Sequence, residues 1–371
     1  MSGKLYLVSP NSAESGTLET LPVTANLVHL KEEDVNEASF NFKKEDKVCV
    51  TSEASLDIVR KKIEDKAKIK GIDCLKDKYQ FREILSELYP GYRFEKIDFK
   101  GIEDLKIEKQ TVLKPLKGCF GTAVKIIDQH SDLKKVSEEV ALEIEKNSSV
   151  LSENVLSKNE FIVEDFIKGE EYAVDMFYDE KGKPHIVNIY HHPMPKIAAY
   201  LHMIYYTSKE VFDKVYDQAN AFFEKLNLIL NVKNLAIHSE FKLDKELFPI
   251  ELNTMRFGGM GLGNMIYHSV GVNPYDCFIK GESPDWNTIW QKNEDSIFAF
   301  LIAYNGTDVN KLNQEPDIEK LKNRFTKLLK ETLFDYKEQL AFGVFCIEET
   351  KSNLEKLLEI DFNDYFKSIN S

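Results

Sequence analysis

Two acidic residues and an amide give the chain its first chemically suggestive pattern. Residues 236–252 read as two strands joined by a four-residue turn, 244–247, and that spacing places Glu240 opposite Glu251. Opposed carboxylates on one face of a sheet repel each other unless a cation lies between them, and Asn253 points to the same face as Glu251. The pattern therefore predicts a cation site made of Glu240, Glu251 and Asn253, whose oxygen ligands suit Mg²⁺. The alternative is a solvated hairpin face on which two carboxylates meet by accident.

A positive charge and a run of glycines follow the acidic strand. Arg256 stays charged at every physiological pH, so it could hold a phosphate group or stabilise a developing oxyanion. His238 stands opposite Asn253, and we expect it to be a neighbour of the cation rather than a ligand. Four glycines would let the backbone approach a ligand closely: Gly258, Gly259, Gly261 and Gly263.

A second pattern, farther upstream, joins a lysine to a glycine loop. Lys114 stands near the end of an apolar strand, and Gly118-x-x-Gly121-Thr122 follows it. A glycine loop between two strands can fold over phosphate groups and donate backbone N–H groups to them, while the lysine adds a point charge. The loop is not a P-loop, because no Gly-Lys-Ser/Thr closes it and no helix follows directly. A plain hairpin turn would explain the same residues equally well.

Composition and charge narrow the function classes. The chain has 371 residues, 43% of them hydrophobic, and a net charge of −13. An acidic protein repels the phosphate backbone, so nucleic acid is not expected as a main partner. The five cysteines are scattered without a C-x-x-C spacing, which argues against a disulfide framework or a zinc site. No secretory h-region and no apolar run of ~18 residues occur, so we expect a cytoplasmic protein without a membrane partner.

Strands and helices alternate along the chain in a way that would position these patterns. Apolar runs at 5–8 and 48–50 read as strands, and a helical pattern follows the second at once, as in an open α/β sheet. A long amphipathic helix begins at Thr207, with Glu210 completing a capping box. After residue 285 the pattern predicts a small closing subdomain, with strand 298–303, helix 318–329, strand 341–347 and helix 352–358.

Five motifs follow one another in a fixed order: Asp77-Lys78-x-x-x-Arg82, 112–115 with its glycine loop, 163–167 followed by 169–175, Glu240, and 251–259. In this order they resemble the ATP-grasp superfamily, most closely its carbamoyl-phosphate-synthase-like group of stand-alone proteins, over roughly residues 73 to 285. The resemblance implies an α/β and α+β architecture in three parts. These are an N-terminal open α/β (pre-ATP-grasp) domain at 1–75, a two-lobed ATP-grasp domain at 76–285, and a small β-α-β-α extension at 286–371. Within the ATP-grasp domain the glycine-loop lobe would span about 108–163 and the metal lobe about 164–285.

The resemblance also implies a role for each matched residue. The ATP phosphates would be contacted by Lys78 and Lys114, beneath a loop that includes Gly118, Gly121 and Thr122. The adenine edge would be read by Glu164, Asp165, Phe166 and Ile167, and the ribose would be held by Glu171. Mg²⁺, which Mn²⁺ could replace, would be bound by Glu240, Glu251 and Asn253. The catalytic residues would be Arg256 and Lys114.

The reaction that the resemblance implies joins a carboxylate to an amine. The γ-phosphate of ATP would pass to the carboxylate and the amine would attack the acylphosphate, which requires positioning and charge neutralisation rather than a protein nucleophile. The substrates would be amino acids or similar small metabolites, contacted by Lys196, His192, Arg256, Gly258 and Gly259. The segment 191–196 reads equally well as an ordinary loop. A kinase or carboxylase on the same scaffold and a nucleotide-binding regulator without chemistry are the alternatives, and the extension could mediate a homodimer.

Overall fold

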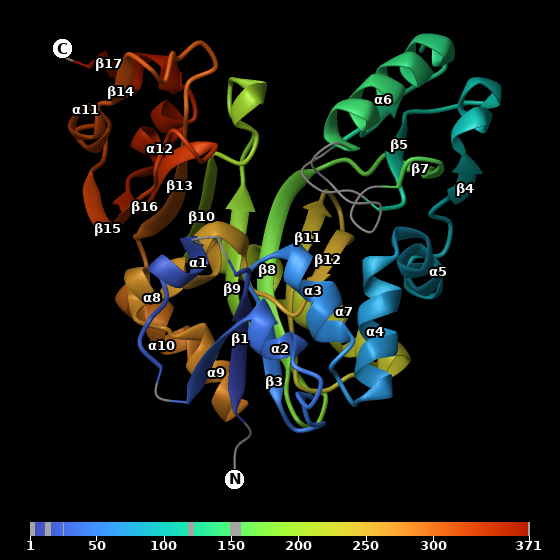
Figure 1. Ribbon diagram of the computed structural model, residues 1–371, viewed down its shortest axis with the longest axis horizontal. Helices are drawn as coiled ribbons and strands as arrows, with labels where there is room; N and C mark the ends of the chain where they lie inside the picture. Colours follow the sequence, from blue (N-terminus) through green and yellow to red (C-terminus); the bar gives the residue numbers. More distant parts are fainter. Residues whose placement is uncertain (1–3, 12–15, 25, 118–121, 149–156, 370–371) are drawn as a thin grey trace.

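The protein is described by a computed structural model that covers residues 4–11, 16–24, 26–117, 122–148 and 157–369. Within these ranges an N-terminal domain lies at the base of two arms (Figure 1). The strands form sheets of three, eight, four and two strands. No helix in these ranges is long and apolar enough to cross a membrane.

The N-terminal domain is an open α/β unit, as the apolar runs predict. Its central strand β1 (Leu5–Ser9) pairs in parallel with β2 (Leu27–Lys31) on one side and β3 (Lys47–Val50) on the other. Every residue of β3 is buried, which is typical of a parallel strand covered on both faces. The helices that connect and follow these strands are α1 (Gly16–Glu19), α2 (Glu32–Asn36), α3 (Glu53–Arg60) and α4 (Lys66–Lys76).

An antiparallel sheet of eight strands forms the centre of the molecule and one of the arms. It runs without a break across the domain boundary expected at residue 285, because β10 pairs directly with β13. In spatial order its strands are β12 (Leu247–Thr254), β11 (Leu235–Leu243), β8 (Glu170–Tyr178), β9 (Pro184–His192), β10 (Ile204–Ser208), β13 (Ile297–Tyr304), β16 (Ala341–Glu349) and β15 (Lys327–Leu333).

One helix expected in the C-terminal part is half wrong. Residues 318–329 form α11 (Ile318–Lys322) and then the start of strand β15. The apolar residues of this segment, Leu321, Phe325 and Leu328, nevertheless reach one hydrophobic cluster. Pairing with β16 satisfies one side of the backbone of β15, and as a strand this segment still brings Leu328 into the cluster.

The remaining C-terminal elements close that arm. The strand predicted at 341–347 is confirmed within β16, and the helix predicted at 352–358 is α12, one residue earlier. The other elements are β14 (Gln314–Pro316), α12 (Lys351–Leu357), η4 (Phe362–Tyr365) and β17 (Phe366–Ser368).

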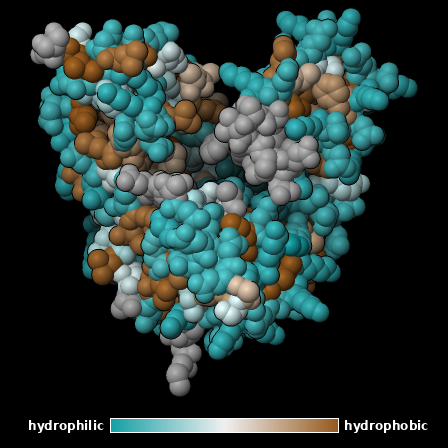
Figure 2. Space-filling view, in the orientation of Figure 1, coloured by the Kyte–Doolittle hydropathy of each residue, from teal (hydrophilic) through white to brown (hydrophobic). Residues whose placement is uncertain are grey.

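The second arm is a four-stranded sheet in the order β4-β7-β5-β6, covered by one helix. The strands that flank the expected glycine loop in the sequence, β5 and β6, belong to this arm. The surface is hollowed between the two arms (Figure 2). The elements are β4 (Phe94–Asp98), η1 (Phe99–Asp104), β5 (Thr111–Pro115), β6 (Lys125–Ile127), α6 (Leu133–Ser148) and β7 (Glu160–Asp165), preceded by α5 (Lys78–Leu88).

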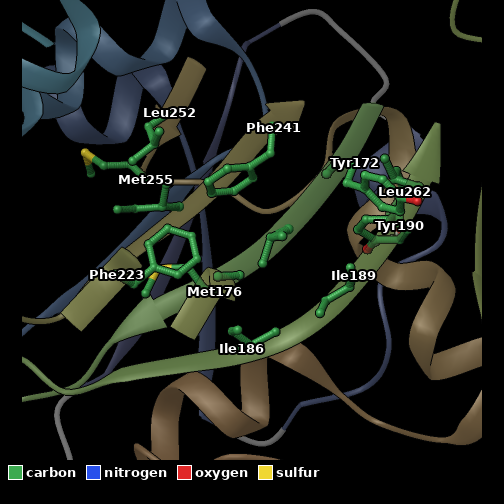
Figure 3. Packing of buried hydrophobic residues seen from close by; sticks show 14 of the residues in the cluster. Tyr172, Met176, Ile186, Ile189, Tyr190, Phe223, Phe241, Leu252, Met255 and Leu262 are labelled. Carbon is green, nitrogen blue, oxygen red and sulfur yellow. Dashed lines mark hydrogen bonds between the residues drawn. The ribbon is translucent and has the colours of Figure 1, made fainter. Parts of the chain in front are cut away.

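The long amphipathic helix is present as α7 (Lys209–Leu230). Its cap is Ser208 rather than Thr207, since the Ser208 side chain accepts the backbone N–H of Val211 at 3.2 Å. The apolar stripe of α7 packs on the central sheet, where Phe223 meets Phe241 at 5.8 Å between ring centroids (Figure 3). The short helices that complete the chain are η2 (Ala198–Tyr200), η3 (Gly259–Asn264), α8 (Met265–Val270), α9 (Pro274–Lys280) and α10 (Trp286–Lys292).

Candidate functional site

The predicted acidic hairpin is present, and Glu240 of β11 lies opposite Glu251 of β12. The turn is one residue shorter than expected, because Leu243 already pairs with Leu247. A bulge next to Glu240 then leaves Ile250 as an extra residue on β12 and restores the register. The two departures cancel, so the carboxylate pair is confirmed although the predicted turn is wrong.

Charge repulsion marks this pair as a place for a cation. Both carboxylates are half-buried. Burial raises the pKa of Glu240 to about 7, and repulsion from Glu251 and from Glu171 adds to the rise. A positive charge between the two carboxylates would relieve that repulsion. Asn253 pairs with His238 two positions farther along the same ladder, so its amide oxygen lies on the face that carries Glu251.

The chemistry of this donor set suits one metal better than others. In the part of the chain that the structure describes, no group of three or more His, Cys, Asp or Glu side chains is arranged to hold a metal ion. The candidate set has two carboxylates and one amide. Mg²⁺ takes one or two carboxylates and completes its octahedron with phosphate oxygens and water. The residues present therefore fit Mg²⁺ bound together with a phosphate ligand, rather than a metal held by protein alone.

A buried carboxylate without a predicted role, Asp175 of β8, lies behind the hairpin. It is fully buried and accepts hydrogen bonds from the Nδ1 of His238 at 2.7 Å, the hydroxyl of Tyr190 at 2.7 Å and the backbone N–H of Gly258 at 2.9 Å. These donors belong to β11, β9 and the loop after β12. Asp175 thus fixes the loop 258–263, which follows β12, against the acidic hairpin. The signal in the sequence was a charged residue inside the apolar run 173–177.

Glu164 of β7 is buried between two positive side chains. Its carboxylate accepts the Nε of Arg82 at 2.6 Å and pairs with the Nζ of Lys114 at 2.5 Å. Burial disfavours the charged form, but Lys114 and Arg82 outweigh it and lower the pKa of Glu164 to about 2. The carboxylate is therefore engaged by protein groups, which leaves only the backbone of Glu164 for the expected contact with an adenine edge.

Lys114 lies among more positive than negative side chains. Burial lowers its pKa, Glu164 opposes that change, and the charges of Arg82 and Lys78 lower it further. Lys78 is the first residue of α5, where Asp77 caps the helix by accepting the backbone N–H of Tyr79 at 2.9 Å. The structure thus brings the two predicted phosphate lysines within electrostatic reach of each other.

The glycine loop can be placed only in part. Thr122 lies within the described residues and is half-buried, just before β6. Gly118 and Gly121 lie outside the described residues. The strands before and after these residues in the sequence, β5 and β6, pair with each other, and β5 also pairs with β7, which carries Glu164.

Glu171, the predicted ribose contact, lies on the same sheet face as Glu240. Its carboxylate accepts the Nδ1 of His192 at 2.7 Å and the Nζ of Lys242 at 2.9 Å. Burial opposes ionisation, but these two partners outweigh it and lower the pKa of Glu171 to about 2. The other ring nitrogen of His192 faces the carbonyl of Leu201 at 2.9 Å, so both nitrogens are engaged and His192 has none left for a substrate.

Lys196 is not brought to the site. Its side chain is 69% exposed and lies 3.7 Å from the carboxylate of Glu359, and its backbone N–H donates to Leu358 at the end of α12. The aromatic residue that does lie at this end of the sheet is Tyr205 of β10. Its ring stacks on His192 at 4.2 Å, and the charges of Glu240, Glu171 and Arg256 act on its hydroxyl.

Arg256 links the acidic strand to the N-terminal domain. Its guanidinium lies 3.2 Å from the carboxylate of Glu53, at the start of α3, while its Nε is buried without a partner among the described residues. Met255 before it has a φ of 61°. This left-handed residue donates its N–H to Ala236 and accepts the N–H of Val50, both at 2.7 Å. Arg256 is thereby fixed at the junction of the two domains, and sequence reasoning missed its partner Glu53.

The loop 258–263 after Arg256 folds tightly on itself and on α1. The carbonyl of Gly258 accepts the N–H of Gly263 at 3.0 Å. Gly261, at φ +97°, lies so close to α1 that a Cβ there would stand 2.5 Å from the Oγ1 of Thr20. Asn264 donates to the carbonyl of Thr17 at 2.8 Å. Gly259 lies beside Arg256, since a Cβ at Gly259 would stand 3.3 Å from the Arg256 guanidinium. The substrate contact expected of Gly258 and Gly259 stays a prediction.

The expected adenine residues Asp165, Phe166 and Ile167 line an open pocket of about 620 Å³. The pocket extends to the end of α5 and to the β11–β12 turn, where Tyr89 and Phe248 form its apolar wall. Lys114 and the acidic pair are not among its lining residues. The pocket therefore lies at the end of β7 but does not include Lys114 or the acidic pair.

Comparison with known proteins bears on these residues directly. Residues 107–264 match the family model described as an ATP-grasp domain. That range includes Lys114, Glu164, Glu171 and the whole acidic hairpin. The chain therefore carries an ATP-grasp domain, and the resemblance seen in its sequence is confirmed. No curated protein sequence matches the chain.

Solved structures extend the likeness to the full chain. A crystal structure of L-amino acid ligase from Bacillus licheniformis matches with a TM-score of 0.68 and 15% identity, covering 100% of both chains. Biotin carboxylase from Campylobacter jejuni, in a β,γ-ATP complex, matches with a TM-score of 0.61 and 13% identity, over 99% of this chain and 87% of that one. N5-carboxyaminoimidazole ribonucleotide synthetase from Thermotoga maritima matches with a TM-score of 0.59 and 14% identity, over 99% of both. The predicted fold class is confirmed.

Proposed function

We propose that the protein is an ATP- and Mg²⁺-dependent ligase that joins a carboxylate to an amine through an acylphosphate. The observation that carries the proposal is the acidic pair of Glu240 and Glu251 inside an ATP-grasp domain, with Arg256 held close by. Facing carboxylates that repel each other are poised for a divalent cation, and the fixed guanidinium is poised for a phosphoryl group.

Each part of the site has a task in this reaction. Mg²⁺ held by Glu240, Glu251 and Asn253 would offset the negative charge of the nucleotide phosphates. Lys78, Lys114 and Thr122 would hold the same phosphates from the opposite arm, with Gly118 and Gly121 in the loop above them. Glu171 would hold the ribose, and the backbone of residues 164–167 would contact the adenine.

The chemistry proceeds in two displacements. A carboxylate oxygen of the acid attacks the γ-phosphorus of ATP, the bond to the bridging oxygen breaks, and ADP leaves. The amine nitrogen then attacks the carbonyl carbon of the acylphosphate, inorganic phosphate leaves, and the nitrogen loses a proton. Arg256 would hold the transferred phosphoryl group in both steps, and Gly258 and Gly259 would contact the acid.

The described cysteines agree with this route, because burial raises the pKa of each thiol, including that of the half-buried Cys74. Cys49 and Cys346 are buried, and burial raises the pKa of the Cys346 thiol to about 12. Burial also raises the pKa of Cys277 to about 11. A thiolate is the nucleophilic form of cysteine, so these side chains are poorly suited to covalent catalysis. Positioning and charge neutralisation by the site are therefore the proposed source of rate enhancement.

Amino acids or similarly small metabolites are the proposed substrates. The likeness in fold to an L-amino acid ligase over the whole of both chains supports this choice.

The test is release of ADP from Mg-ATP in the presence of amino acids, supplied singly and in pairs. A ligase requires one acid and one amine before ADP accumulates, and the ligated product is identified by mass spectrometry. ADP release with a single hydroxyl compound would indicate a kinase instead, and release with bicarbonate would indicate a carboxylase. Nucleotide binding without ADP release under any of these conditions would indicate a regulator and overturn the proposal.

A further inference from the structure

One arginine that the proposed reaction does not use is buried more completely than any group that it does use. Arg82 of α5 is 1% exposed. Its Nε and one terminal nitrogen donate to the carboxylate of Glu164, at 2.6 and 3.3 Å. The same terminal nitrogen donates to the carbonyl of Ile250 at 2.9 Å. Arg82 therefore joins three separate elements: its own helix, the strand β7 of one arm and the strand β12 of the acidic hairpin.

The charges in this place do not balance. One carboxylate, that of Glu164, is in contact with two cations, Arg82 and Lys114. The charge of Lys78 acts on Lys114 as well. An excess of positive charge in a buried place is unfavourable unless an anion completes it. Among the described residues this excess positive charge agrees with a phosphate group binding beside Lys114.

One feature of Arg82 lowers the stability of the fold instead of raising it. Its second terminal nitrogen is buried without a hydrogen-bond partner among the described residues, which costs free energy. Its guanidinium stacks near the ring of Tyr92 at 5.7 Å, and this holds its plane in place. Both interactions with Glu164 come from the fixed fork of the guanidinium, a geometry that lysine cannot reproduce.

We propose that Arg82 is a positioning residue that keeps Glu164 neutralised and so leaves Lys114 available to the nucleotide phosphates. The inference rests on the proposed function, in which Lys114 contacts ATP. When phosphate binds, Lys114 moves from Glu164 to the phosphate oxygens, and Arg82 alone then holds the buried carboxylate. Without Arg82, Glu164 retains Lys114 as its only partner and competes with the nucleotide for it.

A second consequence follows from the contact with Ile250. That residue is the extra one in the bulge, immediately before Glu251. Because Arg82 binds both the bulge and Glu164, it fixes the distance between the lysine end and the metal end of the site. A single side chain thereby sets the separation that the triphosphate and its metal have to span.

The experiment is a double-mutant cycle on nucleotide affinity. The variants are Arg82→Met, Glu164→Gln and the double variant, and the readout is the Kd of Mg-ATP by calorimetry. Arg82→Met should weaken binding about 10- to 100-fold, the size expected for the loss of a charge-assisted interaction. Removing Glu164 as well should free Lys114 again, so that the double variant binds at least about fivefold more tightly than Arg82→Met.

Controls separate positioning from general damage to the fold. Arg60→Met removes a surface arginine whose ion pair with Asp73 is about one-third exposed, and it should leave the Kd unchanged. Thermal unfolding of each variant reports its stability. If Arg82→Met does not fold, the same cycle is run with Arg82→Lys, which keeps the charge and loses the fork. Recovery on adding Glu164→Gln is the expected result there as well.

Failure of the inference differs from failure of the proposed function. Unchanged affinity in a folded Arg82 variant, or a double variant no better than Arg82→Met, would overturn the role of Arg82 alone. A wild-type protein that does not bind Mg-ATP, or a Lys114→Met variant with wild-type affinity, would overturn the proposed nucleotide site. A role of Arg82 in stability only would lower the unfolding temperature without the recovery in the double variant.

Discussion

The ion pair of Glu171 with His192 and Lys242 offers a quantitative test of the electrostatics at the site. Its carboxylate has a pKa lowered from 4.5 to about 2, and its side chain is only 19% exposed. This lowering of the pKa corresponds to roughly 3 kcal/mol of folding free energy at neutral pH. Partial exposure reduces this figure, so we expect Glu171→Gln to lower the free energy of unfolding by about 2 kcal/mol at pH 7.

The pH dependence of that loss gives the prediction its direction. A carboxyl group whose pKa is lower in the folded state stabilises the protein above its unfolded pKa, and this stabilisation disappears as the pH falls through the folded value. The difference between the wild type and Glu171→Gln should therefore be fully present at pH 7, shrink below about pH 4.5, and approach zero towards pH 2. Urea denaturation followed by fluorescence at pH 7, 5, 4 and 3 measures it.

The adjacent residue supplies a matched control. Glu170 also pairs with a lysine, Lys214, but its side chain is 54% exposed. Solvent screens such a pair, so Glu170→Gln should change the free energy of unfolding by less than about 0.5 kcal/mol. Equal losses for the two variants, or a loss for Glu171→Gln that stays constant from pH 7 to pH 3, would show that packing rather than charge is responsible. Either result would refute the reasoning.

Three further predictions concern the acidic hairpin, the loop 258–263 and the buried carboxylate of Asp175. Glu251→Ala should lower ADP release by about 100-fold or more, since a metal ligand is lost, whereas Glu224→Ala, on the exposed face of α7, should leave the rate unchanged. Gly261→Ala should lower the free energy of unfolding by roughly 2 kcal/mol or more, because its φ is +97° and a neighbouring oxygen lies 2.5 Å from the new Cβ. The control Gly271→Ala, at φ +80° with no atom near the new Cβ, should lower it by only roughly 1 kcal/mol. Urea denaturation measures both changes. Asp175→Asn should raise the KM of the acceptor more than that of ATP, with kcat/KM lower by roughly 10-fold, measured with ATP saturating; equal changes in both KM values would argue against its role in holding the loop.

The acidic hairpin shows how far local sequence patterns reach. Alternation along a strand fixes which residues share a face, so Glu240, Glu251 and Asn253 could be grouped from spacing alone. The length of the turn and the bulge at Ile250 could not be predicted, because both depend on how β12 meets Arg82 and the rest of the sheet. The predicted pairing of Glu240 with Glu251 is correct because the shorter turn and the extra residue Ile250 shift the register in opposite directions.

Residues whose role depends on distant partners were harder to predict. Glu164 matches its motif, yet its carboxylate is occupied by Arg82, which is 82 positions away in the chain. Glu53 lies beside Arg256 only because β12 docks on the N-terminal domain. Lys196 and His192 share a short local segment, but contacts with Glu359 and Leu201 outside that segment decide where their side chains lie.

The C-terminal part shows a different limit. The apolar spacing of residues 318–329 satisfies a helical period, and its apolar residues do reach the core. Whether such a segment is a helix or a strand depends on an available sheet edge. That edge is β16, which follows later in the chain, so a pattern within the segment contains no information about it.

The unbroken central sheet makes the unit that folds larger than the unit that carries the chemistry. A chain shortened to the end of the family match at residue 264 would keep the candidate nucleotide and metal residues named here. It would also lose β13, and β10 (Ile204–Ser208) would then present an unpaired edge that recruits other strands. Such a fragment should aggregate rather than act alone. In directed evolution or domain fusion, the C-terminal strands should therefore be treated as part of the scaffold and not as a removable attachment.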